Sequence, residues 1–490
     1  MFIDNLKDTL NVSTTENGAL GYATTGKALV DFNFKVASMR NWSEENIKRE
    51  FKKVWYENKE LALKYLFYVR DVREGLGERR LFREAITEII DNLDSRVFDW
   101  IMKFGRADDL LVFLGTKLEK DLIDYIQVQL EKDMQGVKDN KPISLLSKWL
   151  PSINTSSKET REKAKQLCES LHITETKYRK MLSKLRKYID VIERKLCANE
   201  WNKVNYETVP SNANLKYKDA FLKHDEDRRK KYLESLEKGE TKINGSVLFP
   251  HDIVAKYVKD SVLKKDETLE ALWKSLPNYV DGSTNTLVVR DGSASMTWSD
   301  TKVRPLDVAT ALAIYFSERC EGQFKDNFIT FSSKPQLVSF TGYETLRDKL
   351  IECSNYKDCS NTDLEATFDL VLDVAVKNHL KQEEIPNLLI ISDMEFDSSY
   401  SVPKYLEDKL FAIIANKFNK AGYQLPKLIF WNVASRTNII PLTQNNNGVI
   451  LVSGFSPAIT KMVLSEELDP YKALVKELMK DRYKEIKLGE

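Results

Sequence analysis

The sequence predicts an α-helical repeat domain over residues 1–280, followed by an α/β doubly wound domain over residues 285–490. Three observations support this fold class. Apolar residues recur at spacings of three and four through the first part, as they do on amphipathic helices. Short apolar strands alternate with helical segments in the second part. Between the two parts, residues 275–286 (SLPNYVDGSTNT) carry the Pro, Gly, Asn and Ser residues typical of a domain boundary.

Charge is distributed unevenly along the chain. Over all 490 residues, 75 Lys and Arg nearly balance 74 Asp and Glu, which excludes a uniformly basic nucleic-acid coat but leaves room for a local basic patch. Residues 158–238 hold 21 basic and 14 acidic residues, a net charge of +7, whereas residues 285–490 hold 24 basic and 28 acidic residues, a net charge of −4. This asymmetry also favours a boundary near residue 280.

Nothing in the sequence indicates a membrane or secretory protein. No apolar run approaches the roughly 18–20 residues of a membrane span, and the first residues lack the basic and apolar regions of a signal peptide. The five cysteines include no CxxC pair, which predicts free thiols in a reducing compartment. We therefore expect a soluble, cytoplasmic protein without a membrane partner.

The helical part has a recognisable start signal. Ser43 is a candidate N-cap, and Glu44 and Glu45 follow it in the first turn, where they face the positive end of the helix dipole. One helix is expected to continue from there through residues 47–72. Further amphipathic segments follow up to residue 238, with no strand alternation. Helices that each expose one apolar face bury it by stacking, so a HEAT-like solenoid, ring or bundle is expected, although no strict repeat period is present.

The second part alternates strands and helices. Strands are expected at residues 285–291, 326–333, 335–340, 387–393, 427–433 and 448–454. Helices are expected at residues 305–320, 345–354, 363–380, 402–422 and 470–487. This order predicts a mostly parallel sheet, and ligands of such sheets bind at the carboxyl ends of the strands.

Five oxygen-bearing residues fall in loops at those strand ends: Asp291, Ser293, Ser295, Thr362 and Asp393. The first three form a DxSxS pattern directly after a strand. One carboxylate and two hydroxyls at this spacing can face one hard cation. Oxygen ligands favour Mg²⁺, with Mn²⁺ and Ca²⁺ as alternatives. The competing interpretation is that these side chains only cap loops.

Arg290, directly before the DxSxS pattern, is unusual for a buried strand. We expect its guanidinium either to weaken cation binding or to pair with an acid such as Glu395 or Asp397. Catalytic signatures are missing from the sequence, because Met296 stands where the GxSxG nucleophile elbow needs Gly, and no phosphate-binding P-loop is present. A non-catalytic protein is expected, with an enzyme as a distant alternative.

Two basic segments are candidate nucleic-acid contacts. The first surrounds a Gly turn and contains Arg70, Arg73, Arg79 and Arg80. The second contains Lys180, Lys184, Lys187 and Tyr188, with Tyr178 nearby. The second set recurs at three and four, so it can share one helical face. Phosphate contacts need Lys and Arg, and stacking needs exposed aromatic rings. A solvated helix face of ordinary charge is the alternative.

The order Asp, Ser, Ser, Thr and Asp on three loops resembles the metal-ion-dependent adhesion site (MIDAS) of von Willebrand factor A domains. In that family the first Asp and both Ser residues hold the cation, and the Thr and second Asp contribute directly or through water. The resemblance implies these roles for the five residues here.

Four further motifs extend the resemblance to most of the chain: RDxRxGxGER from Arg70, GRxDDLL from Gly105, FWNV from Phe430 and VSGFSP from Val452. With them the chain resembles an uncharacterised family (domain of unknown function 2828 type) related to the TROVE/Ro group, whose members join a helical ring to a von Willebrand factor A domain. The resemblance implies a ribonucleoprotein that binds small structured RNA, or single-stranded RNA ends. The alternative is a protein-interaction scaffold in which an acidic protein ligand completes the bound cation.

Overall fold

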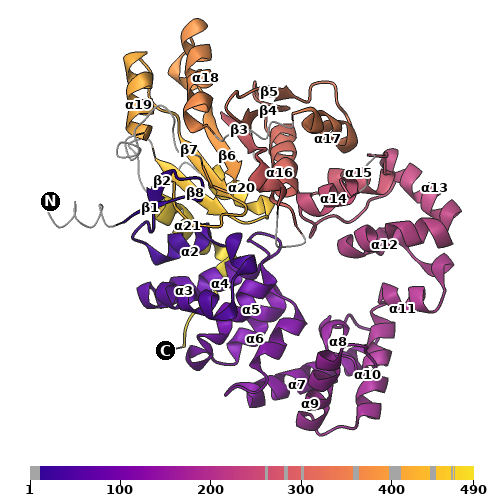
Figure 1. Cartoon of the computed structure of the whole chain (residues 1–490). Helices are drawn as coiled ribbons and strands as arrows, with labels where there is room; N and C mark the ends of the chain where they lie inside the picture. The colour runs from indigo at the N-terminus through magenta and orange to yellow at the C-terminus, as the bar shows by residue number, and fades with distance from the viewer. Residues whose placement is uncertain are drawn as a thin grey trace. The chain divides into compact units, whose positions relative to one another are not determined.

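The computed structural model describes residues 11–259, 263–280, 285–298, 303–356, 363–396, 410–441, 448–464, 467 and 469–489. Its internal contacts divide the chain into two compact units (Figure 1). The sheet unit comprises Met1–Asn58 and Gly245–Asp481, and the helical unit comprises Lys59–Asn244 and Arg482–Glu490. The sequence boundary at residues 280–285 lies inside the sheet unit, because segments on both sides of it pack around the same sheet.

Six strands form the sheet in the order β5-β4-β3-β6-β7-β8. They are β3 (Thr286–Asp291), β4 (Asn327–Phe331), β5 (Leu337–Ser339), β6 (Asn387–Ser392), β7 (Leu428–Asn432) and β8 (Val449–Ser453). All neighbours are parallel except β4 and β5, which are antiparallel. The six predicted strands are confirmed, and the mostly parallel sheet has one antiparallel edge.

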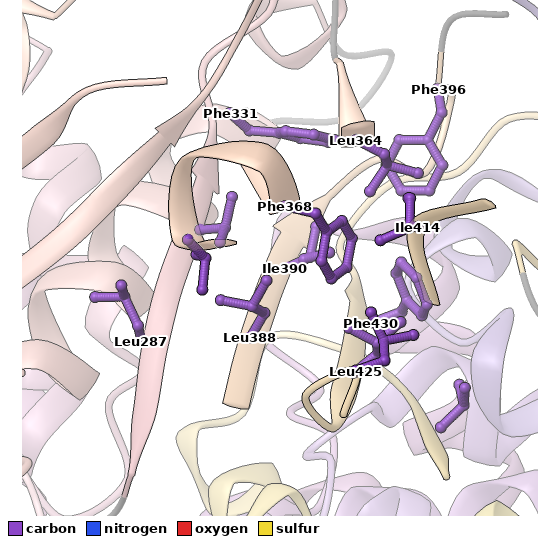
Figure 2. Close-up of a cluster of buried hydrophobic side chains, with 14 of the residues drawn as sticks. Leu287, Phe331, Leu364, Phe368, Leu388, Ile390, Phe396, Ile414, Leu425 and Phe430 are labelled. Atoms are coloured by element: carbon purple, nitrogen blue, oxygen red, sulfur yellow. The ribbon is translucent and has the colours of Figure 1, made fainter. Parts of the chain in front are cut away.

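Alternating apolar residues build one buried face of this sheet. The strand register places five of them side by side on neighbouring strands, namely Ile329, Val289, Ile390, Phe430 and Leu451. Helices α2 (Ala28–Phe34), α18 (Leu364–Lys377) and α19 (Leu410–Lys420) pack against this face, as Figure 2 shows for Phe368 of α18. Such a continuous apolar layer is the main stabilising feature of the unit.

The opposite face of the sheet is covered by α16 (Pro305–Arg319), which contacts β3, β4 and β6. Arg290 alternates with Val289 along β3, and its guanidinium donates to the Thr310 hydroxyl of α16. Helices therefore lie on both faces, as expected for a doubly wound sheet. The other helices of this unit are α3 (Glu44–Glu57), α14 (Pro250–Tyr257), α15 (Glu267–Lys274), α17 (Leu346–Asn355), α20 (Thr460–Val463) and α21 (Pro470–Leu478). The last helix ends at Leu478, earlier than predicted.

A short hairpin near the N-terminus was not expected from the sequence. Strands β1 (Val12–Thr14) and β2 (Leu20–Tyr22) pair antiparallel. Tyr22 forms a β-bridge with Ile440, and the Thr15 hydroxyl donates to the Phe396 carbonyl at 2.7 Å. These bonds tie residues 12–22 to loops at the sheet.

The helical unit consists of successive helices joined by short connectors. They are α4 (Lys59–Arg70), α5 (Arg79–Thr87), α6 (Arg96–Phe104), α7 (Glu119–Lys138), α8 (Leu146–Trp149), α9 (Lys158–Ser170), α10 (Glu175–Tyr188), α11 (Ile192–Cys197), α12 (Ser211–His224) and α13 (Glu226–Glu237). Across both units, no helix in the described part of the chain has the length and apolar character needed to cross a membrane.

The predicted helix over residues 47–72 is interrupted in the structure. Ser43 caps α3 as expected, because its hydroxyl accepts the Asn46 backbone N–H at 3.2 Å. Asn58, however, has an extended backbone (φ −159°, ψ 107°) and separates α3 from α4. The single long helix is therefore wrong, and α3 and α4 belong to different units.

The segment after Asp481 completes the helical unit. Asp71 is buried directly after α4, and its Oδ2 accepts hydrogen bonds from the Arg482 guanidinium and, at 3.1 Å, from the Tyr483 hydroxyl. The Lys64 ammonium donates to the Tyr483 carbonyl at 3.1 Å. Residues 482 and 483 thus supply the counter-charge and the hydrogen bonds that a buried carboxylate needs.

Candidate functional site

The DxSxS loop begins where β3 ends, at the fully buried Asp291. Its Oδ1 accepts the Ser293 backbone N–H at 2.9 Å, and its Oδ2 accepts the Ser392 hydroxyl at 2.6 Å. The Ser293 and Ser295 hydroxyl oxygens lie 2.9 Å apart. The loop therefore gathers one carboxylate and two hydroxyls, as the spacing predicts.

Asp393 reaches the same edge of the sheet because β6 is the parallel neighbour of β3. Burial and the nearby Asp291 carboxylate raise the pKa of Asp393 to about 7, and burial also raises the pKa of Asp291. Hydrogen bonds from Ser295 and the Glu395 backbone only partly offset this rise. The two carboxylates thus disfavour each other's charged form. Thr362, the remaining predicted ligand, lies outside the described residues.

Two residues at this edge, Glu395 and Arg436, have roles that the sequence did not predict. The buried Glu395 carboxylate accepts the backbone N–H groups of Arg436 at 2.7 Å and Thr437 at 2.8 Å, which fixes the loop after β7. Arg436 then extends towards Asp393, with 3.5 Å between Nη2 and Oδ2, and towards Glu16, with 2.7 Å between Nε and Oε2. The charge of this guanidinium partly compensates the two acidic side chains, so a cation placed here would compete with it.

Arg290 forms its hydrogen bonds on the α16 face of the sheet, and its charge partly offsets the burial that raises the pKa of Asp291. Its guanidinium donates to the Thr310 hydroxyl at 3.3 Å and to the Tyr356 carbonyl at 3.2 Å, and lies 5.3 Å from the centre of the Phe328 ring. The suggested pairing with Glu395 is wrong, because strand alternation directs Arg290 to the α16 face of the sheet. The other suggested partner, Asp397, lies outside the described residues.

The DxSxS loop and Asp393 lie at one edge of the sheet, which we call the DxSxS edge. The donor atoms there fit a hard divalent cation. Within the described ranges, no group of three or more His, Cys, Asp or Glu side chains gathers to hold a metal. A cation at this edge would therefore be held by two carboxylates together with hydroxyls and water. These are the oxygen ligands that Mg²⁺ uses in proteins.

The four arginines around the Gly turn of the helical unit are not equivalent. Arg70 is buried, and its Nε lies 2.7 Å from the Asp109 carboxylate. Arg73, Arg79 and Arg80 are exposed. Arg79 approaches Asp108 at 4.0 Å, and Arg80 approaches Glu84 at 3.7 Å. Arg70 is therefore placed to stabilise the fold rather than to contact a ligand.

The second basic set lies on α10. Lys180, Lys184 and Lys187 are exposed, and Tyr188 is half-buried, with its hydroxyl donating to the Lys141 carbonyl at 2.9 Å. Tyr178, by contrast, is fully buried, and its hydroxyl donates to the Pro151 carbonyl at 2.9 Å. The prediction that Tyr178 offers an exposed stacking surface is wrong, since its ring packs in the core.

Comparison with known proteins gives two family matches. Residues 15–92 and 121–290 match the model described as "Domain of unknown function (DUF2828)", and residues 285–487 match "Domain of unknown function (DUF7788)". The chain is also 31% identical, over 513 aligned residues, to "Uncharacterized protein L728" of Acanthamoeba polyphaga mimivirus. That alignment covers 95% of this chain and 87% of the relative. The chain belongs to the DUF2828 family.

The two matched regions divide the candidate residues of this DUF2828 protein. The DUF2828 match contains the arginines of the Gly turn and the lysines of α10, and the DUF7788 match contains the whole DxSxS edge. The matches meet at residues 285–290, where the sequence composition changes, whereas the compact units divide elsewhere. Residues 15–58 lie in the DUF2828 match but pack with the sheet.

Proposed function

We propose that this protein binds RNA without catalysing a reaction, through a basic face of α10 made of Lys177, Lys180, Lys184 and Lys187. The observation that carries the proposal is that these exposed lysines have no acidic partner within ion-pair distance in the described part of the chain. The resemblance to the TROVE/Ro group adds support from an independent direction.

Lysines on other helices of the unit pair with acidic side chains. On α9, Lys163 pairs with Glu159 at 2.7 Å and Lys158 with Glu162 at 3.8 Å. On α13, Lys230 pairs with Glu226 at 2.6 Å. An i,i+4 acid is the usual partner of a helical lysine, and these helices supply one.

On α10 the sequence ETKYRKMLSKLRKY contains six basic residues and a single acid, Glu175. The four lysines recur at intervals of three, four and three, so they form one stripe about 15 Å long at 1.5 Å per residue. Like charges at these spacings repel one another. A phosphate backbone laid along the stripe relieves this repulsion and releases counterions.

The test is filter binding of a structured RNA and of a single-stranded RNA over a range of salt concentrations. Each phosphate contact contributes about 0.7–0.9 to the slope of log affinity against log salt, so four contacts predict a slope of about −3. An absence of salt-sensitive binding to either RNA would overturn the proposal and favour the interaction scaffold.

We also propose that Asp291, Ser293, Ser295 and Asp393 hold a divalent cation, Mg²⁺ first, in the manner of the von Willebrand factor A domains that the sheet unit resembles. Two neighbouring buried carboxylates and two hydroxyls 2.9 Å apart support this assignment. When bound, the ion supplies a Lewis-acidic anchor for a carboxylate of an acidic protein ligand. Trp298, which is 69% exposed beside the loop, offers the aromatic contact common in protein interfaces.

A further inference from the structure

A cavity of about 490 Å³ lies in the helical unit between α10, α11 and the segment 152–154. Its size falls within the range of small-molecule sites. Three arginines line it, Arg179, Arg186 and Arg194, and none of the lining residues is acidic. The cavity is therefore a concave surface with three positive charges.

Arg186 is anchored entirely by neutral acceptors. Its Nε donates to the Ser147 carbonyl at 2.8 Å, and its two Nη atoms donate at 2.7 Å to the Ser152 hydroxyl and the Leu150 carbonyl. Burial lowers the pKa of this guanidinium. Because neutral acceptors fix its position without compensating its charge, an anion beside it is favourable.

Arg194 and Arg179 also bring positive charges to the cavity. Arg194 donates to the Ser183 carbonyl at 2.6 Å. It also helps to lower the pKa of the Glu200 carboxylate, but Glu200 pairs with Lys203 at 2.6 Å. In the described residues, no carboxylate lies within ion-pair distance of any of the three arginines.

The rest of the cavity wall suits a nucleotide. Leu182, Ile153 and Ala198 provide apolar surface, and Ser183 and Asn154 provide hydrogen-bonding groups. On α10, Arg179 and Ser183 precede Lys180 and Lys184 by one residue, about 100° around the helix. The cavity therefore opens directly beside the α10 basic face.

We propose that this cavity binds the terminal phosphate of an RNA strand whose backbone follows the α10 basic face. The proposal rests on the RNA binding proposed above. A terminal phosphate monoester carries a charge of about −1.5 to −2 at neutral pH, more than an internal phosphodiester. Arginine forks bind phosphate oxygens in pairs, and a concave site admits a strand end more readily than a continuous chain.

The test compares short single-stranded RNAs of one sequence that carry a 5′-phosphate, a 3′-phosphate or only hydroxyl ends. Wild type is expected to bind one phosphorylated form at least about tenfold more tightly than the hydroxyl form, a difference of about 1.4 kcal/mol. Arg179→Gln and Arg194→Gln should each reduce this preference while leaving affinity for the hydroxyl form nearly unchanged. Arg161→Gln on α9, outside the cavity, is the matched control. Arg186 is left intact because its bonds hold the segment 147–152.

Cys197 gives a second readout, because it is exposed and lines the cavity. Adenosine monophosphate should slow alkylation of Cys197 by iodoacetamide in wild type but not in Arg194→Gln, as measured on the Cys197 peptide by mass spectrometry.

The outcomes separate the two proposals. Equal affinity for all three RNAs without protection of Cys197 overturns the cavity proposal, while a steep salt dependence of the hydroxyl RNA still supports the α10 basic face. Protection by adenosine monophosphate without binding of any RNA overturns RNA as the partner. Tighter binding of a phosphoserine peptide than of the phosphorylated RNAs overturns it in favour of a protein ligand.

Discussion

The Arg70 guanidinium lies 2.7 Å from the Asp109 carboxylate, and both side chains are buried. Arg83 donates to Asp109 Oδ1 at 2.6 Å, and the Arg106 backbone N–H donates at 2.9 Å to Oδ2, the oxygen that Arg70 contacts. One carboxylate thus joins the end of α4, the first turns of α5 and the segment that follows α6. Arg70 and Asp109 thus belong to a buried ion-pair network in the helical unit, whereas Arg73, Arg79 and Arg80 of the same Gly turn are exposed.

Asp109→Ala is expected to lower the free energy of unfolding of the helical unit by about 3–5 kcal/mol, because it leaves a buried guanidinium without its counter-charge. Urea unfolding followed by circular dichroism measures this loss. Asp124→Ala, which removes an exposed carboxylate from α7, should change the free energy by less than about 0.5 kcal/mol. Equal effects of the two substitutions would contradict the role of Asp109.

Stability of the sheet unit should depend on pH through His251. This residue lies on α14, and the centres of its ring and the Phe455 ring are 5.0 Å apart. Burial lowers the pKa of His251 to about 4; the nearby Asp252 raises this pKa and Arg40 lowers it. Between pH 6.5 and 4 the unfolded chain binds a proton that the folded chain does not. The free energy of unfolding therefore falls as pH drops through this window.

The expected loss from His251 is about 2 kcal/mol between pH 7 and pH 5. His251→Phe keeps an aromatic ring and removes the titration, so its unfolding free energy should change less over this range than that of wild type. Denaturant unfolding at a series of pH values provides the measurement. Identical pH slopes for the two proteins would refute the assignment.

Asp291→Ala is expected to abolish binding of Mn²⁺, used as a calorimetric probe for Mg²⁺, because it removes one of two carboxylates at the DxSxS edge. The sheet should remain folded by circular dichroism. Asp369→Asn removes a partly exposed carboxylate of the same unit that pairs with Lys417, and it should leave Mn²⁺ affinity unchanged. Unchanged Mn²⁺ affinity in Asp291→Ala would contradict the proposed set of ligands.

Charge reversal of Lys180, Lys184 and Lys187 to Glu should weaken RNA binding and make the log–log salt slope shallower by about one per lost phosphate contact. The matched control reverses three lysines that have acidic partners: Lys158, Lys163 and Lys230. This control alters net charge equally. A similar loss of affinity in both triple variants would show that overall charge, rather than the α10 basic face, governs binding.

Limited proteolysis should cut the exposed residues 238–240, which follow α13, without separating the two products. The N-terminal product keeps residues 12–22, which bond to loops of the sheet, and the C-terminal product keeps Arg482, which bonds to Asp71. Native electrophoresis is expected to show one species, and denaturing electrophoresis two fragments. Two separate native species would contradict these pairings.

Most of the correct sequence predictions rest on local patterns of a few consecutive residues. The six strands and the DxSxS edge follow from apolar runs and from the residues at their ends, since parallel neighbours bring their carboxyl ends together. Ser43 was found because an N-cap acts over only three residues. Asn58 was missed because it continues the helical periodicity, and its extended backbone reflects tertiary packing rather than local propensity.

Long-range partners had no signal in a single sequence. Arg70 and Asp109 are 39 residues apart, and Glu395 fixes residues 41 and 42 positions further on. Arg436 reaches the acidic edge only because that loop is fixed. Arg194 lies on α11 and lines the cavity because the turn between α10 and α11 brings the two helices together. The sequence shows that each of these side chains is charged, but the partner of each charge depends on the folded structure.

Residues 482 and 483 also determine when the helical unit can complete its folding during synthesis. Asp71 and Arg482 are separated by 411 residues, and at about 5–20 residues per second translation needs roughly 20–80 s to cover that interval. During this time the acid beside α4 has emerged while its guanidinium partner has not been made. The surface around Asp71 therefore stays open to solvent and to molecular chaperones for most of the biosynthesis of this stretch, and the final packing of an early segment follows the synthesis of a late one.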